Sequence, residues 1–344
     1  MFSEDELNEY AGLPRIKNMP PANGRANKKK ANPAARQAAV QIQASLAEQD
    51  EEQRDYAFTY DASRHERLWI MDSLGAFYEL RWFSDVLRLV KGGKEASVYQ
   101  CQVPPGSPVR DSYLAAKVYR PRQFRSLKND FLYREGRADL DINGNVVLDD
   151  GMLHAMRKRT AYGRELLHTS WIGHEYKTLQ ALHAAGCDVP QPFASGDNAI
   201  LMGYIGGDEL AAPTLNTVEL DPVEALQLYQ RALYNIELML AHGRVHGDLS
   251  AFNILYWEGE ITLIDFPQAI VPGENRSAYP IFERDVTRVC EYFARQGIRS
   301  QPQQVAEKLW KAHHLRHRPE IDLRLLDAGD ERDRRLWQSQ REEE

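Results

Sequence analysis

Two side chains near residue 250 have the types and the spacing that phosphoryl transfer needs. Asp248 follows His246-Gly247, and Asn253 comes five residues later, across a short loop. Phosphoryl transfer needs a carboxylate to orient or deprotonate the acceptor, and oxygen ligands for the magnesium ions that neutralise the phosphates. We therefore expect Asp248 to be the catalytic carboxylate and Asn253 to bind a metal ion through its amide oxygen.

A second carboxylate follows at the end of an apolar run. The pattern predicts a hairpin of residues 254–257 and 261–264 around the turn Glu258-Gly259-Glu260. The second strand ends at Asp265, so the hairpin should return this carboxylate to the cleft that holds Asp248. There Asp265 can chelate the magnesium that bridges the phosphates. Each of these residues alone would more often be a cap or turn residue, but the combination is specific.

A glycine turn and a lysine on an apolar strand form a candidate phosphate site. The turn is Gly92-Gly93-Lys94-Glu95, and Ala115-Ala116-Lys117-Val118-Tyr119 follows it. Glycines let the backbone approach a phosphate closely, and the exposed N–H groups of such a turn favour anions. Lys117 can contact the phosphates if a carboxylate on a nearby helix holds it in place.

Three glutamates could serve this site. Glu175 is the best candidate to hold Lys117, because it lies on one apolar stripe of a helix predicted over residues 165–185. Glu165 on the same helix is a competitor. Glu95 stays a candidate group of the phosphate loop.

Together these segments resemble the RIO family of atypical protein kinases. The resemblance covers about residues 65 to 297, and its motifs are specific in combination. Asp265-Phe266-Pro267-Gln268 is closer to the second RIO subfamily, whereas the catalytic loop is closer to the first. The matching segments are Gly93-Lys94-Glu95-Ala96-Ser97-Val98-Tyr99, Trp171-Ile172-Gly173-His174-Glu175-Tyr176, His246-Gly247-Asp248-Leu249-Ser250, Asn253-Ile254-Leu255-Tyr256, Ile264-Asp265-Phe266-Pro267-Gln268 and Phe282-Glu283-Arg284-Asp285-Val286.

The resemblance implies an α+β, two-lobed protein-kinase-like fold that uses ATP and Mg²⁺ to phosphorylate serine or threonine in proteins or in itself. It implies that Asp248 is catalytic, that Asn253 and Asp265 bind metal, and that Asp265 could itself be phosphorylated during ATP hydrolysis. Met202 would lie near the gatekeeper position, and Tyr204 and Ile205 in the hinge that contacts adenine. The other nucleotide-binding residues implied are Gly93, Lys94, Glu95, Ser97, Lys117 and Glu175.

The order of the predicted elements, strands first and helices later, fits this two-lobed enzyme. Dense apolar and aromatic residues between 63 and 89 predict a helical N-terminal extension. Strands are expected at 90–103, 113–119 and 199–205, and helices at 221–243, 282–296 and 302–315. The predicted units are a disordered basic arm (1–55), a helical segment (56–89), an N-lobe (90–205) with a flexible insert (about 120–164), a C-lobe (206–325) and a charged tail (326–344).

The basic arm is the candidate contact for nucleic acid. Residues 11–47 carry Lys and Arg side chains but no Asp or Glu. Two interpretations of this arm stay open. It could be a solvated tail, or it could contact ribosomal RNA or a pre-ribosome, because Lys and Arg gain affinity by releasing phosphate counterions. The net charge of −7 argues against a protein that coats nucleic acid over its whole surface. The acidic N-terminus and the lack of a long apolar run predict no secretion signal, no membrane span and a cytoplasmic location.

Two other functions fit the same residues. Aminoglycoside and choline phosphotransferases share the pattern HGDxxxxN and the later Asp, so a small-molecule kinase is one alternative. The GKExxVY turn and the segment Ile264-Asp265-Phe266-Pro267-Gln268 count against it. The other alternative is a ribosome-assembly factor that binds RNA through its arm and hydrolyses ATP.

Overall fold

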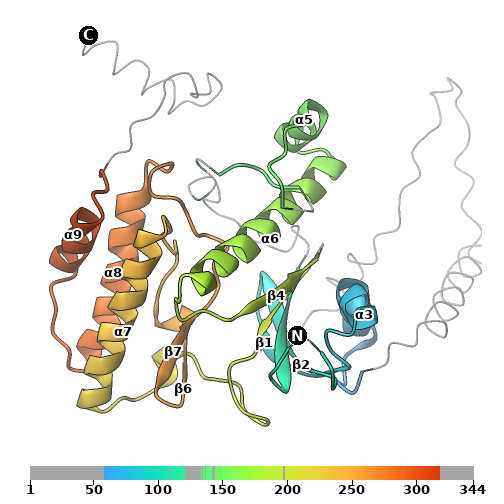
Figure 1. Ribbon diagram of the computed structural model, residues 1–344, viewed down its shortest axis with the longest axis horizontal. Helices are drawn as coiled ribbons and strands as arrows, with labels where there is room; N and C mark the ends of the chain where they lie inside the picture. The colour runs from blue at the N-terminus through green and yellow to red at the C-terminus, as the bar shows by residue number, and fades with distance from the viewer. Residues whose placement is uncertain are drawn as a thin grey trace, which may run out of the picture.

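The computed structural model describes residues 58–107, 109–120, 133, 135, 137–141, 144–196 and 198–317. In this part of the chain, an antiparallel sheet with one covering helix forms one half, and three packed helices form the other (Figure 1). The long helix α6, residues Ala161–Ala184, lies between the two halves. The α+β, two-lobed architecture expected from the sequence is therefore confirmed. The predicted basic arm and charged tail lie outside the described residues.

The N-lobe sheet has the strand order β1-β2-β3-β5-β4, and every neighbouring pair is antiparallel. Its side chains alternate between two faces, as the period of two along a strand requires. Tyr99, Cys101 and Leu114 pack on the outer face, whereas Ala115 and Tyr119 join the core shared with the C-lobe. The strands are β1 (Asp85–Gly92), β2 (Ala96–Gln102), β3 (Tyr113–Tyr119), β4 (Pro192–Ser195) and β5 (Ala199–Gly203).

Helix α3, residues Arg64–Glu79, covers the outer face of this sheet (Figure 1). Ser63 caps it by accepting a hydrogen bond from the backbone N–H of Glu66. The helical segment predicted for 56–89 is too long, because β1 already begins at Asp85. Here the chain reverses at Arg81, which has a φ of 59°, and Val86 becomes a buried strand residue.

The C-lobe packs helices α7 (Pro222–Ala241), α8 (Ala278–Arg295) and α9 (Pro302–Ala312) side by side (Figure 1). A hairpin of β6 (Ile254–Trp257) and β7 (Glu260–Leu263) lies where the sequence predicts it, and the short 3₁₀ helices are η2 (Leu215–Thr217) and η3 (Ala251–Asn253). Apolar side chains of all these helices meet in one core. None of the described helices is long and apolar enough to cross a bilayer.

The described part of the predicted insert, 120–164, contains helical structure that the sequence did not suggest, while residues 121–132 lie outside the described residues. Helix α5, Asp150–Lys158, is folded there, and α6 begins at Ala161 rather than at residue 165. Both starts carry a side-chain cap: Asp149 accepts from the N–H of Met152, and Thr160 accepts from the N–H of Gly163. Side-chain caps are local sequence signals of helix N-termini, and the mixed charge of this segment does not reveal them.

A further difference is β4, which was not expected from a sequence with Pro190 just before the strand and Pro192 at its start. The strand lies at the sheet edge beside β5, where a residue without an N–H is tolerated. β5 itself ends at Gly203, two residues before the predicted end.

Candidate active site

A cavity of about 850 Å³ lies between the sheet and the C-lobe. It is the size of a site for a nucleotide-sized ligand. Most residues predicted to bind nucleotide or to act in catalysis line it together. They are Gly93, Lys94, Glu95, Lys117, Glu175, Met202, Tyr204, Ile205, Asp248 and Asp265.

Lys117 lies at the centre of a compact group of charges in this cavity. Its Nζ donates to Glu175 Oε1 at 2.5 Å and to Asp265 Oδ1 at 2.6 Å. The hydroxyl of Tyr119 donates to the other carboxylate oxygen of Glu175, at 2.8 Å. The geometry thus selects Glu175 as the partner of Lys117, whereas Glu165 is exposed. One lysine therefore ties strand β3, helix α6 and the segment after β7 together.

Burial and charge pairing oppose each other in this group. Burial alone would lower the pKa of Lys117, but the carboxylates of Asp265 and Glu175 outweigh it and raise that pKa. Burial would raise the pKa of Asp265, but the charge and hydrogen bond of Lys117 outweigh it, so this pKa lies below its usual value. Lys117 is therefore held as a cation and Asp265 as an anion near neutral pH.

The catalytic loop holds Asp248 and Asn253 against each other. Asn253 Nδ2 donates to the backbone oxygen of Asp248 at 2.9 Å and lies 3.4 Å from its Oδ2. Because the amide nitrogen faces Asp248, the amide oxygen is the atom that Asn253 can offer to a cation. Asn253 is 8% exposed and is not among the residues that line the cavity.

His246 joins the catalytic loop to the segment that carries Asp265. Its Nδ1 accepts from the N–H of Asp248 at 3.3 Å, so Nε2 is left to donate to the backbone oxygen of Ile264 at 3.1 Å. The ring also packs against Phe266 in a tilted arrangement, with centroids 4.6 Å apart. Buried His246 is therefore a structural link between the two aspartates and does not line the cavity.

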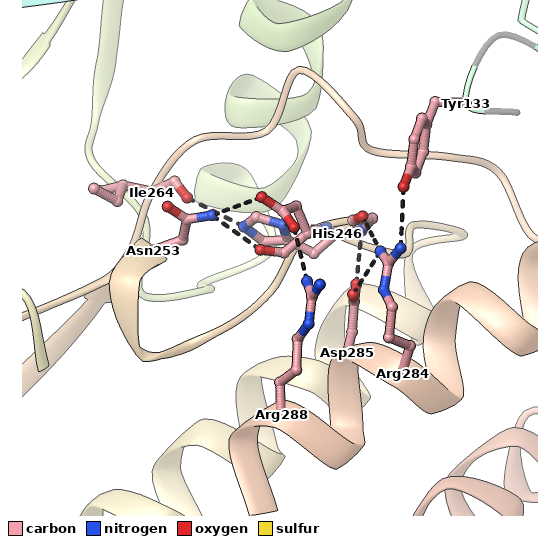
Figure 2. Close-up of polar contacts among 9 residues, drawn as sticks. Tyr133, His246, Asn253, Ile264, Arg284, Asp285 and Arg288 are labelled. Atoms are coloured by element: carbon pink, nitrogen blue, oxygen red, sulfur yellow. Dashed lines mark hydrogen bonds and ion pairs between the residues drawn. The ribbon is translucent and has the colours of Figure 1, made fainter. Parts of the chain in front are cut away.

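The loop is anchored from below by helix α8 (Figure 2). Buried Asp285 accepts from the N–H of Gly247 at 2.8 Å, and Arg284 donates to the Gly247 carbonyl and to Asp285 Oδ1. Burial raises the pKa of Asp285 despite its cationic neighbours. Gly247 has a φ of 86°, and a Cβ there would collide with the carbonyl of Gln268. Glycine is thus required at this position.

Helix α8 also places a cation directly on Asp248. Arg288 Nη1 donates to Asp248 Oδ1 at 2.8 Å (Figure 2). Sequence reasoning missed this contact and the anchoring roles of Arg284 and Asp285. The available signal was Arg284 and Arg288 four residues apart on a predicted helix, which places both side chains on one face.

Gly93, Lys94 and Glu95 of the glycine turn line the cavity, whereas Ser97 does not. Gly93 donates its N–H to the Ala96 carbonyl at 2.9 Å, and a Cβ on Gly93 would also meet that oxygen at 2.9 Å. Ala96 and Val98 line the cavity, but Ser97 between them is buried and does not. Because strand side chains alternate, Ser97 faces away from the predicted nucleotide.

The oxygen donors at this site fit a magnesium ion that also binds substrate phosphates better than a metal ion that binds protein side chains only. In the described part of the chain, no group of three or more His, Cys, Asp or Glu side chains could hold a metal ion. Magnesium is commonly bound by one or two carboxylates together with substrate phosphates. The Asp265 carboxylate and the Asn253 amide oxygen are donors of the suitable hard type.

The two lobes, the bridging lysine and the loop that carries Asp248 define a protein-kinase-like fold. The RIO domain family matches residues 147–306. The RIO-type serine/threonine-protein kinase Rio1 of Thermoplasma acidophilum is 33% identical over 141 residues, 41% of this chain and 73% of the relative. For Rio1 of Methanocaldococcus jannaschii the identity is 24% over 257 residues, covering 74% of this chain and 83% of the relative.

The human serine/threonine-protein kinase RIO1 is 26% identical over 212 residues, 61% of this chain, but this chain spans only 33% of that longer relative. The chain belongs to the RIO family, and the names of its relatives support a RIO-like kinase function. All three relatives carry the Rio1 name.

Proposed function

We propose that this protein is an ATP- and Mg²⁺-dependent serine/threonine protein kinase that transfers the γ-phosphate to a protein hydroxyl, including its own. The observation that carries the proposal is the position of Lys117. It bridges Glu175 and Asp265 inside a cavity that Asp248 also lines. Membership of the RIO family supports the same conclusion.

Each residue would have a distinct part in the reaction. Val98, Ala115 and Met202 line the cavity and provide apolar surfaces for the adenine ring. Lys117, oriented by Glu175, would contact the phosphates, and the turn of Gly93, Lys94 and Glu95 would lie beside them. Asp248 would orient the acceptor hydroxyl and receive its proton as the oxygen attacks the γ-phosphorus, the bond to the β–γ bridging oxygen breaks and ADP leaves.

Asp265 and Asn253 would hold the magnesium ion, which would supply positive charge to neutralise the phosphates. Asp265 must turn from Lys117 toward the metal or share its two oxygens between them. The carboxylate is suited to this because its side chain is 41% exposed while Lys117 is 10% exposed. The anionic state of Asp265 near neutral pH supports the same role.

The test is incubation of the purified protein with γ-labelled ATP and Mg²⁺, followed by separation of the products. The proposal expects label on serine or threonine of an added protein or of the chain itself, and no transfer without Mg²⁺. Label in an acyl phosphate or as free phosphate, with none on a hydroxyl, would instead indicate an ATPase that uses Asp265. Transfer to a hydroxylated small molecule, but to no protein, would favour the small-molecule kinase.

The contact with ribosomal RNA is a separate proposal that rests on the basic residues at 11–47, which lie outside the described residues. Its test is RNA binding by the full chain and by a variant that lacks residues 11–47. Loss of salt-sensitive binding in the shortened protein would support the arm as the contact. Unchanged binding would remove it.

A further inference from the structure

Asp248 is in contact with a cation that the nucleotide chemistry does not use. Arg288 reaches from α8 to Asp248 Oδ1 at 2.8 Å, and both side chains are half-exposed (Figure 2). Under the proposed function the acceptor hydroxyl must approach the Asp248 carboxylate. A half-exposed guanidinium beside that carboxylate therefore lies where the residues next to the acceptor hydroxyl would dock.

Arg288 has hydrogen-bond donors left to offer at this position. A guanidinium carries five N–H donors. The contact with Asp248 is the one bond of Arg288 found among the described residues. The neighbouring Arg284 differs, because it donates to Gly247, Asp285 and the hydroxyl of Tyr133. Of these two arginines, Arg288 is thus the one suited to bind a ligand.

The chemistry of the side chain indicates what that ligand is. A guanidinium binds planar carboxylates and phosphoryl groups through two parallel hydrogen bonds. A half-exposed ion pair contributes little to stability, so the Arg288–Asp248 contact is not needed to hold the fold. It does place a positive charge at the acceptor side of the catalytic carboxylate.

We propose that Arg288 selects acceptor segments that carry an anionic side chain, a carboxylate or a phosphoryl group, close to the serine or threonine hydroxyl. This inference rests on the proposed kinase function and adds the class of acceptor to it. The anionic group would take up the donors of Arg288 that Asp248 does not use.

The test uses matched peptides that differ in the residue beside the acceptor serine: Glu, Gln, phosphoserine or Lys. The wild-type protein should phosphorylate the Glu or the phosphoserine peptide with a kcat/KM about tenfold above that for the Gln peptide. Arg288→Gln should bring this ratio close to one, and Arg288→Glu should shift the preference to the Lys peptide. Ratios are compared within each variant, so a general loss of turnover does not affect them. Arg295→Gln, at an exposed position near the far end of α8, is the matched control.

The outcomes separate the inference from the proposed function. If Arg288→Gln lowers the turnover of every peptide equally, Arg288 only positions Asp248 and the inference is wrong while the kinase function stands. Equal use of all peptides by the wild-type protein would also overturn it. If the wild-type protein hydrolyses ATP but labels no peptide or protein hydroxyl, the kinase function fails together with the inference. Preference for the Glu or for the phosphoserine peptide tells the two anionic sources apart.

Discussion

The cleft contains two ion pairs of similar length in opposite surroundings. At the N-lobe side, Lys117 contacts Glu175 at 2.5 Å, and their side chains are 10% and 1% exposed. At the C-lobe side, where the acceptor is proposed to bind, Arg288 contacts Asp248 at 2.8 Å, and their side chains are 39% and 44% exposed. By distance alone the two pairs would be expected to contribute equally to stability, but their solvent exposure differs greatly.

The difference in exposure predicts which pair is needed for stability and which pair can vary without loss of the fold. Removing one partner of a buried pair leaves an uncompensated charge in a poorly solvated place, which is strongly destabilising. Removing one partner of an exposed pair lets water solvate the other, so stability changes little. The N-lobe pair should therefore be essential to both fold and nucleotide binding, whereas the acceptor-side pair can be varied for substrate recognition. Four measurements test this contrast.

The largest effect should come from the two aspartates. Asp248→Ala removes the group proposed to receive the acceptor proton, and it should lower phosphotransfer by about 10³-fold. Asp265→Asn removes the anionic metal ligand and should reduce transfer to background. Both are measured by label transfer from ATP at saturating Mg²⁺, with circular dichroism to check the fold. Near wild-type transfer by either folded variant would contradict the assigned role.

The next effect is on stability and concerns Lys117. Lys117→Met keeps the volume of the side chain but leaves buried Glu175 without its cation, so the free energy of unfolding should fall by about 3 kcal/mol. Urea denaturation of the ATP-free protein measures this change. Lys308→Met, at an exposed position on α9, is the matched control. Equal effects of the two substitutions would show that burial does not set the cost.

A smaller effect should appear in the pH dependence of the same group. The pKa of Asp265 is lowered in the folded protein, so its contribution to stability is present above the unfolded value, about 3.9, and is lost as the pH falls below it. The pKa of Lys117 is raised, so its contribution is complete below about 10.4 and is lost as the pH rises through the folded value.

The stability difference between the wild-type protein and Asp265→Asn should therefore be constant from about pH 6 to 9 and shrink below about pH 4. Chemical denaturation at several pH values measures it. A difference that grows on acidification would have the wrong sign for a lowered pKa.

The smallest effect is expected at the exposed pair. Arg288→Gln should change the free energy of unfolding by less than about 1 kcal/mol, because Asp248 becomes hydrated when its partner is removed. The same denaturation assay, run beside Lys117→Met, gives the comparison directly. A loss as large as that of Lys117→Met would mean that Arg288 holds the catalytic loop in place and would remove the contrast between the two pairs.

Most of the elements that carry the site could be predicted from local patterns. The β6–β7 hairpin, helices α7 to α9 and the strand with Lys117 lie near their expected positions, because alternation, capping and helical period are properties of adjacent residues. Boundaries were less predictable at β1 and α6. Prolines also hid β4, since whether a proline strand is tolerated depends on its lying at a sheet edge.

By itself, the sequence determined which residues could do the chemistry and where each lies along its own element. The spacing from His246 to Asn253 belongs to one loop, and the alternation of β2 and β3 places Lys117 on one face of the sheet. Tertiary structure alone decided which charges meet. Lys117 contacts carboxylates 58 and 148 residues away. Its helix partner is Glu175 rather than Glu165, because side chains ten residues apart on a helix lie about 15 Å apart along the axis and face different directions. Arg288 likewise reaches Asp248 because α8 packs beneath the catalytic loop. Local spacing fixes the direction of a side chain within its element, but contacts between distant elements depend on how the whole core packs.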